Sequence, residues 1–184
     1  AASDVYKRQE WPVEPGRSRH AALSSFGFSG TNAHVVISEG ITQPHTQADT
    51  AQEWLVVLSA KDEERLRESV RNLLDFMNKA TDIRLSDLAY SLQLGREAMT
   101  HRLAVVGNGR QPLIQMLEAY LAGHSVAGCV AGRIGAGGVA LDDTQEGRAF
   151  IRELAMNRRL GKLAQLRVEG CSVDWQALYE PGQV

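Results

Sequence analysis

The chain has 184 residues, of which 43% are hydrophobic and 23% charged, and its formal net charge is -2. This composition is typical of a globular protein and argues against disorder, collagen and coiled coil. The near-neutral charge removes the electrostatic basis for nucleic-acid binding. No apolar run approaches the ~20 residues of a membrane span, and the N-terminal residues lack the apolar core of a secretory signal. Two cysteines without zinc-type spacing, Cys129 and Cys171, indicate reduced structural thiols in a cytoplasmic protein.

The first forty residues divide into four predicted segments. Residues 1–9 show no apolar period and are interpreted as an unrelated leader or artefact. Prolines in the next ten residues favour an extended approach. Residues 26–32 form a glycine-hinged turn with two aromatic side chains, and the β-branched run at 33–38 is typical of a buried strand. The following polar residues, 41–52, predict a linker.

A second unit is predicted over residues 53–124. Its elements are, in order, a strand at 55–58, a helix at 60–79 that starts near Ser59, a helix from Ser86 to Gly95, a strand at 103–106, and a helix from Pro112 to Gly123. This order indicates a small α+β unit whose helices cover one face of a sheet.

The rest of the chain is predicted to be a glycine-rich loop and a helical tail. Residues 125–145 carry no regular pattern, and their glycines fail the G-x-G-x-x-G order of a dinucleotide loop. Apolar residues near 150–154 and 160–166 indicate two helices, and a last turn begins at 173–175. The tail is taken as residues 146–184.

The aromatic–glycine turn is the strongest candidate for chemistry. A glycine-hinged loop exposes backbone N–H groups beside bulky apolar side chains. Such N–H groups can form half of an oxyanion hole, and a hinged phenylalanine can gate an apolar tunnel. The same composition also fits a tight turn before a core strand with packed phenylalanines, and composition alone favours that structural interpretation.

The order of residues 24–37, Ser-Ser-Phe-Gly-Phe-Ser-Gly-Thr-Asn-Ala-His-Val-Val-Ile, strongly resembles the C-terminal end of the ketosynthase domain of modular polyketide synthases. Trp11-Pro12 and the Arg17/Arg19 pair also resemble that family. The resemblance implies a thiolase fold whose catalytic cysteine and two histidines lie upstream of this segment.

This resemblance assigns roles within the turn. The backbone N–H of Phe28 helps to form the oxyanion hole, and its ring gates the acyl pocket. The substrate-binding residues that it implies are Phe26 as a lining aromatic, Gly27, Ser29 and Gly30 as the hinge, and Thr31 and Asn32 as an anchoring polar pair. His34 becomes a residue of the terminal strand rather than a catalytic base.

Residues 53–124 resemble the linker subdomain that follows a ketosynthase, on Leu58-Ser59-Ala60-Lys61, on residues 87–97 and on His101-Arg102-Leu103-Ala104. In the family this linker packs on the ketosynthase and helps to shape the carrier-protein docking surface. Residues 146–180 resemble the short remnant found in modules without an integrated acyltransferase. One departure is Arg167, which stands where a tryptophan is common.

Two further patterns are candidates for catalysis. Gly123-His124-Ser125 resembles the start of an acyltransferase nucleophile elbow, but that chemistry needs a strand before the serine and a helix after it. A helix leads in and a glycine-rich coil leads out, so Gly123 is better interpreted as a helix C-cap. Acidic and basic residues at 63–67 indicate a solvated helix face with no catalytic carboxylate pair.

The expected fold is therefore α/β to α+β: residues 10–40 as the C-terminal strand piece of a thiolase-fold ketosynthase, then the α+β linker subdomain and the helical tail. The parent would catalyse decarboxylative Claisen condensation. This chain alone, without the nucleophile and both histidines, is expected to be inactive. Its residues 1–40 in isolation are expected to be poorly ordered or aggregation-prone, because an unpaired apolar strand exposes its edge.

The resemblance also implies partners. They are the remainder of the ketosynthase, an acyl carrier protein and, as a further candidate, a separate acyltransferase, with the parent a homodimer. No metal or cofactor is expected to bind directly, since the phosphopantetheine arm is carried by the carrier protein. Two alternatives stay open: a non-catalytic linker or docking module, and an acyltransferase that uses Ser125.

Overall fold

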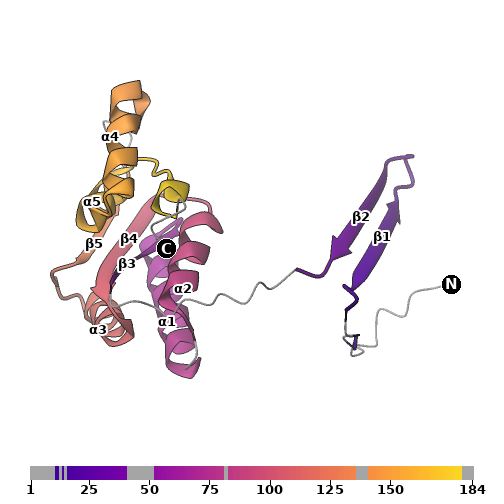
Figure 1. Cartoon of the computed structure of the whole chain (residues 1–184), viewed down its shortest axis with the longest axis horizontal. Coiled ribbons are helices and arrows are strands. Elements are labelled where there is room, and N and C mark those ends of the chain that lie inside the picture. Colours follow the sequence, from indigo (N-terminus) through magenta and orange to yellow (C-terminus); the bar gives the residue numbers. More distant parts are fainter. Residues whose placement is uncertain are drawn as a thin grey trace. The chain divides into compact units, whose positions relative to one another are not determined.

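The chain divides into two units, residues 1–47 and 48–184 (Figure 1). A computed structural model describes residues 11, 12, 14, 16–40, 52–80, 83–135 and 141–179. The boundary between the units lies within the polar segment that was predicted as a linker.

The first unit is an antiparallel hairpin. Strands β1 (His20–Phe26) and β2 (Asn32–Ser38) pair so that Leu23 lies opposite Val35. The strand predicted at 33–38 is confirmed, but the side chains of Val35, Val36 and Ile37 are 50–63% exposed in this structure, so their burial in a larger sheet stays a prediction. A two-stranded hairpin leaves both of its faces open. Strand β1 was not predicted, because its small residues carry no strand pattern and it forms only through pairing with β2.

The second unit is built on a three-stranded antiparallel sheet in the order β3-β4-β5. The strands are β3 (Glu53–Ala60), β4 (His101–Asn108) and β5 (Cys129–Arg133). In the central strand, Leu103 pairs with Leu58 on one side and with Ala131 on the other.

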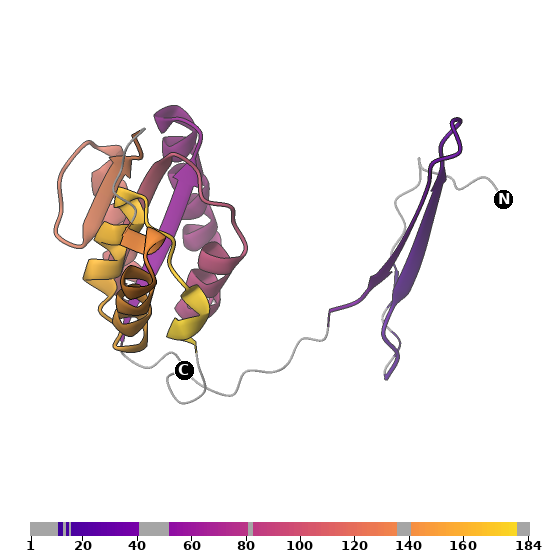
Figure 2. The same cartoon turned by 90° about the horizontal axis from the view of Figure 1, so that it is seen from above.

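Helices cover both faces of this sheet, as Figure 2 shows. On one face Val56 and Leu103 pack in a core with the first three helices, and on the other Leu55 and Ala104 pack with the last elements. The helices are α1 (Glu63–Lys79), α2 (Leu85–Leu94) and α3 (Arg110–Leu121) on the first face, and α4 (Gln145–Met156), α5 (Leu160–Glu169) and the 3-10 turn η2 (Trp175–Leu178) on the second. The prediction that the helices of residues 53–124 cover one face is therefore confirmed, and the predicted helical tail covers the other face. Alternating side chains of a strand point to opposite faces, and here both sets are apolar.

Strand β5 and a short 3-10 turn, η1 (Leu141–Asp143), lie inside the stretch that was predicted to be a structureless loop. The ladder to β4 extends beyond the strand, since Val106 N donates to Gly128 O at 2.8 Å and Ile134 N donates to Thr100 O at 2.9 Å. A Cβ atom at Gly132 would lie 2.6 Å from Val168 Cγ1. Gly132, which weakens the strand pattern in the sequence, thus lets α5 approach the sheet closely.

The end of α3 confirms the C-cap interpretation of the Gly-His-Ser segment. Gly123 has φ +80°, its N–H donates to Tyr120 O at 3.0 Å, and the His124 N–H donates to Ala119 O at 2.9 Å. These two bonds form a Schellman motif, which satisfies the last carbonyl groups of a helix. Ser125 follows a helix instead of a strand, so it does not stand on a nucleophile elbow.

The structure around α1 differs from the sequence prediction in two details. Asp62, not Ser59, is the N-cap, because its carboxylate accepts from Arg65 N at 2.9 Å. The Ser59 hydroxyl instead donates to Glu97 O at 3.2 Å. The predicted solvated face is also incomplete, since the guanidinium of half-buried Arg67 donates to Leu121 O at the end of α3.

Candidate functional site: the hairpin tip

The turn between β1 and β2 is held by backbone hydrogen bonds. Gly27 N donates to Thr31 O at 2.8 Å, and Gly30 N donates to Gly27 O at 3.0 Å. A Cβ atom on Gly27 would lie 2.6 Å from Thr31 O, and Gly30 has φ +87°. Each glycine is therefore required for its own reason, one for close backbone approach and one for a left-handed conformation.

The turn brings the predicted site residues to one exposed tip. Phe26 is 78% exposed and the Phe28 side chain is fully exposed. Among the described residues, no acceptor lies within hydrogen-bonding distance of the Phe28 N–H. The N–H without an acceptor and the exposed ring are therefore compatible with both expected roles of Phe28, as an oxyanion donor and as a gate of the acyl pocket. Ser29, Thr31 and Asn32 are also exposed, so the anchoring role of the last two stays a prediction.

The histidines of the hairpin are engaged in cross-strand pairs. His34 Nδ1 lies 2.8 Å from Ser24 Oγ, and His20 Nδ1 lies 2.9 Å from Ser38 Oγ. Each pair joins residues that face one another in the register. His34 therefore acts as a strand residue here, in agreement with its exclusion from the candidate bases.

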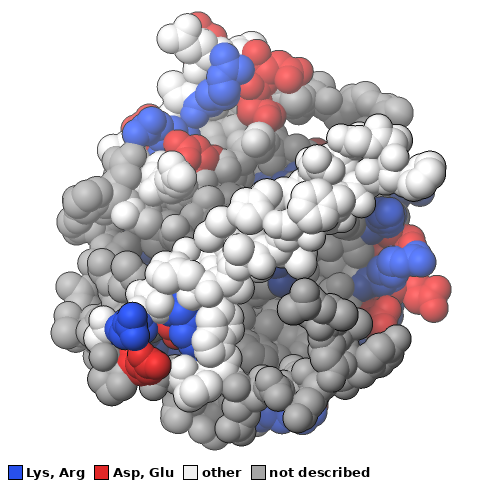
Figure 3. All heavy atoms as spheres, turned by 90° about the vertical axis from the view of Figure 1, so that its right-hand side faces the viewer, with Lys and Arg blue, Asp and Glu red and all other residues white. Residues whose placement is uncertain are grey.

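The open end of the hairpin is closed by an ion pair that sequence reasoning missed. Arg19 Nη2 lies 2.6 Å from Glu39 Oε1, Arg19 N donates to Glu39 Oε2 at 3.1 Å, and Arg19 Nη1 donates to Trp11 O at 2.7 Å. The hydrogen bond from Arg19 lowers the pKa of Glu39, and the same bond raises that of Arg19. Residues 20–38 hold no Lys, Arg, Asp or Glu, and Figure 3 shows an uncharged band across the face that is in view.

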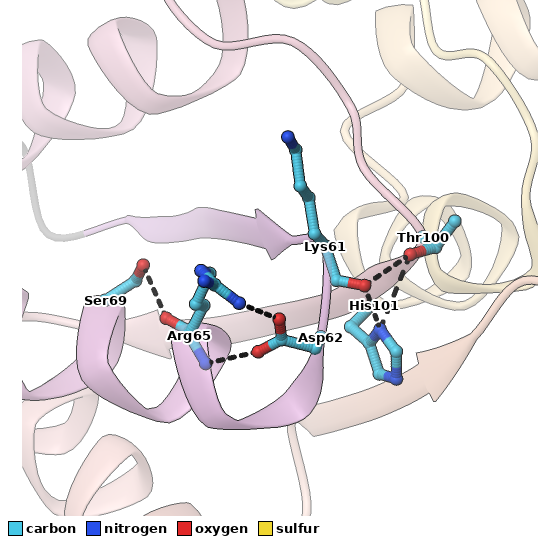
Figure 4. Close-up of polar contacts among 6 residues, drawn as sticks. All are labelled: Lys61, Asp62, Arg65, Ser69, Thr100 and His101. Atoms are coloured by element: carbon cyan, nitrogen blue, oxygen red, sulfur yellow. Dashed lines mark hydrogen bonds and ion pairs between the residues drawn. The ribbon is translucent and has the colours of Figure 1, made fainter.

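In the second unit, a polar cluster joins the start of α1 to the start of β4 (Figure 4). The Lys61 carbonyl oxygen accepts from Thr100 Oγ1 at 3.0 Å and from His101 Nδ1 at 3.1 Å. The Lys61 ammonium group points away from these partners. The Arg65 N–H bond, together with the Arg65 side chain, lowers the pKa of Asp62. Because each group serves a backbone atom or a helix cap, the cluster is structural.

A chain of polar side chains links the end of η2 to the edge strand β3. Gln93 Nε2 donates to Leu55 O at 2.7 Å, and Tyr179 Oη donates to Gln93 Oε1 at 2.6 Å. The Tyr179 ring meets the Tyr90 ring edge-on, with centroids 4.9 Å apart. Burial raises the pKa of Tyr179 well above its usual range. The last turn is thereby fixed on β3 and α2.

A cavity of about 930 Å³ lies beside α1, α2 and the end of β3. Phe76, Tyr90 and Leu94 line it and are 38–49% exposed, and Arg167 of α5 also lines it. Sequence reasoning noted Arg167 only as a departure from the resemblance. Within the described ranges, no group of three His, Cys, Asp or Glu side chains could hold a metal ion, and no helix is long and apolar enough to cross a membrane.

Comparison with known proteins shows which proteins contain segments similar to this hairpin and sheet. Residues 57–124 match the model of the RhiE-like, KS-MAT linker domain family. The chain is 38% identical over 174 residues to the polyketide synthase PksL of Bacillus subtilis, covering 92% of this chain and 4% of that protein. The chain is homologous to the ketosynthase–linker region of modular polyketide synthases.

Two solved structures support the same assignment for this polyketide synthase segment. The ketosynthase from module 6 of the bacillaene synthase of Bacillus subtilis 168 is 37% identical with a TM-score of 0.67, covering 94% of this chain and 30% of that one. The ketosynthase from module 1 of the bacillaene synthase of Bacillus amyloliquefaciens FZB42 is 31% identical with a TM-score of 0.59, covering 89% and 28%. The chain thus spans about a third of each solved ketosynthase and a few per cent of its curated relatives.

Proposed function

We propose that this chain supplies the C-terminal part of a ketosynthase and its flanking linker to a polyketide synthase module. The parent condenses an acyl group held on a cysteine with a malonyl unit held on a carrier protein. In this step the malonyl carboxylate leaves as CO₂, the resulting carbanion attacks the acyl thioester, and the cysteine thiolate leaves. The supporting observation is the unpaired N–H of the fully exposed Phe28, in a chain homologous to ketosynthases.

The hairpin tip serves the tetrahedral stage of this reaction. As the thioester carbonyl is attacked, its oxygen becomes an alkoxide, and a fixed N–H donor stabilises that charge where water is excluded. The Phe28 N–H is the donor, and the two glycine constraints of the turn hold it in place. Its ring, which is fully exposed in this unit, gates the acyl pocket.

Partners complete the site. The cysteine nucleophile and both histidines come from the remainder of the ketosynthase, and the malonyl unit arrives on the phosphopantetheine arm of an acyl carrier protein. A separate acyltransferase loads that carrier, the parent is a homodimer, and it acts in the cytoplasm. The second unit positions these partners through its exposed surfaces, with its sheet covered on both faces.

A chimera tests this proposal. Residues 10–40 replace the homologous segment of the bacillaene module 6 ketosynthase, and self-acylation of its cysteine by an acyl thioester is followed by intact-protein mass. Phe28→Pro removes the N–H and is expected to slow acylation about 100-fold, the cost of one lost oxyanion donor. Phe28→Ala, the matched control, removes the same ring and keeps the N–H at position 28. Equal rates in the two folded variants would contradict the role of Phe28.

The second candidate function is a non-catalytic linker that scaffolds a carrier protein or an acyltransferase. It is favoured by the second unit, which has a core on each sheet face built from its own residues. Residues 52–179, prepared without the hairpin, should then bind carrier protein in a calorimetric titration as tightly as the whole chain does. Loss of binding on removal of the hairpin would reject this candidate.

A further inference from the structure

Arg167 differs from the other buried arginine in having no partner. Its side chain is 9% exposed, on α5, and none of the described residues accepts a hydrogen bond from its guanidinium. Arg102, which is 7% exposed, donates instead to the carbonyl oxygens of Met99 and Arg167 at 2.9 and 2.7 Å. A buried charge without a partner is costly, so an unpaired buried guanidinium requires an explanation.

The electrostatic surroundings of Arg167 deepen this cost. Desolvation by burial, together with the nearby charge of Arg102, lowers the pKa of Arg167 to about 10. The group is still a cation at neutral pH. Among the described residues, Asp142 Oδ1 is the side-chain oxygen or nitrogen that is both fully buried and without a hydrogen-bond partner. The Arg167 nitrogens also have no partner but are not fully buried, so each of them retains contact with solvent. Arg167 lines the cavity, which provides that contact.

Apolar side chains of α1 and α2 form part of the remaining lining, together with polar and charged residues that include Asn72, Arg96 and Glu97. The lining includes Leu73, Phe76, Leu88, Tyr90 and Leu94 from α1 and α2. Its volume of about 930 Å³ falls within the range of small-molecule sites, which combine an apolar wall with a few fixed polar groups. A guanidinium at such a wall offers two parallel N–H donors, the geometry that fits a carboxylate.

We propose that this cavity binds a carboxylate joined to an apolar group, with Arg167 holding the carboxylate and the aromatic and leucine side chains of α1 and α2 holding the apolar part. A single charge on the ligand neutralises a single unpaired cation. A phosphate would bring a second charge. The second arginine of the lining, Arg96, is exposed to solvent and donates to Gly95 O at 3.1 Å, so no second buried, unpaired cation among the described lining residues neutralises that charge. The same chemistry is offered by a free aliphatic acid and by an acidic side chain between apolar residues.

The acids that already line the cavity do not neutralise Arg167. Asp87 is paired with Arg84 at 2.7 Å. Glu97 is exposed, and none of its atoms lies within 4.0 Å of a guanidinium nitrogen of a described residue. The variant Glu97→Gln is therefore expected to bind the ligand as well as the natural sequence does. It serves as the control for an ion pair between Glu97 and Arg167.

Nuclear magnetic resonance of the whole chain tests the proposal through the Nε–H signal of Arg167. The free-acid arm compares hexanoate with hexanamide, acetate and sulfate. The peptide arm compares acetyl-Leu-Glu-Leu-amide with its glutamine counterpart. Hexanoate is expected to shift the signal with at least tenfold tighter binding than acetate or hexanamide. The arm that saturates at the lower concentration identifies the source of the carboxylate.

Variants separate binding from folding. Arg167→Met should abolish the hexanoate response of the cavity methyl groups while raising the melting temperature, because it removes an unpaired buried charge. Arg167→Trp restores the residue that the resemblance expects and should behave in the same way. The proposal is overturned if hexanoate leaves the Arg167 signal unchanged, if sulfate binds as well as hexanoate, or if the Arg167→Met chain keeps its affinity.

Discussion

At the scale of single residues, the buried side chain of Arg102 donates to backbone carbonyl groups that the secondary structure leaves unpaired. Arg102 extends from β4 to the carbonyl oxygens of Arg167 and Cys171, at 2.7 and 3.5 Å, near the end of α5. A cation near a helix C-terminus is also favoured by the helix dipole. Burial lowers the pKa of Arg102, and the carboxylate of Asp142 opposes that effect.

Arg158 carries a backbone strain that a pair of substitutions can measure. It has φ +49° at the end of α4, where its N–H donates to Ala155 O at 2.9 Å, and its side chain donates to Glu53 O at 2.9 Å. Both Arg158→Gly and Arg158→Ala lose the side-chain contact. Only the alanine keeps the left-handed penalty, so the glycine variant should be more stable by about 1 kcal/mol. Urea unfolding of both variants checks this, and equal midpoints would contradict it.

At the scale of elements, the cap of α1 predicts a pH dependence. The hydrogen bond from Arg65 N lowers the pKa of Asp62 below its ordinary value of 3.8. A group whose pKa falls on folding stabilises the fold above its unfolded pKa, and that stability is lost as the pH falls through the folded value. The natural chain should therefore exceed Asp62→Asn in melting temperature at pH 7.

This difference should shrink as the pH falls below about 4, because protonation removes the charge that distinguishes the carboxylate from the amide. Asparagine keeps the capping oxygen, so the comparison isolates the charge. Thermal unfolding from pH 7 to pH 2.5 provides the measurement. A difference that stays constant over this range would show that the Asp62 charge does not stabilise the helix.

At the scale of the whole molecule, the second unit depends on its last forty residues. The side chains of Leu55, Val57, Ala104 and Val106 point to the face that α4, α5 and η2 cover. A shorter chain, residues 52–124, contains the subdomain that the sequence predicted at residues 53–124. It would leave this face open and is expected to aggregate or unfold without cooperativity.

The matched chain, residues 52–179, keeps both helix layers and should unfold in one cooperative step in urea. Hydrogen exchange should then protect β4 most strongly, since it is the central strand. A cooperative transition of residues 52–124 alone would show that the second helix layer is not required. Exchange of the hairpin amides should be fast in the whole chain, because its apolar side chains lie exposed.

The sequence by itself determined the elements with strong local signals and the likeness to a ketosynthase terminus with its linker. These signals are local, so they can be recognised without coordinates: the apolar period of α1, the glycine after α3 and the order of residues around Phe28. Only the tertiary structure decided that β5 exists, that helices cover both faces, and that Arg167 is unpaired beside a cavity. The physical reason is that strand pairing, burial and the absence of a partner are relations between distant residues, which no local pattern encodes.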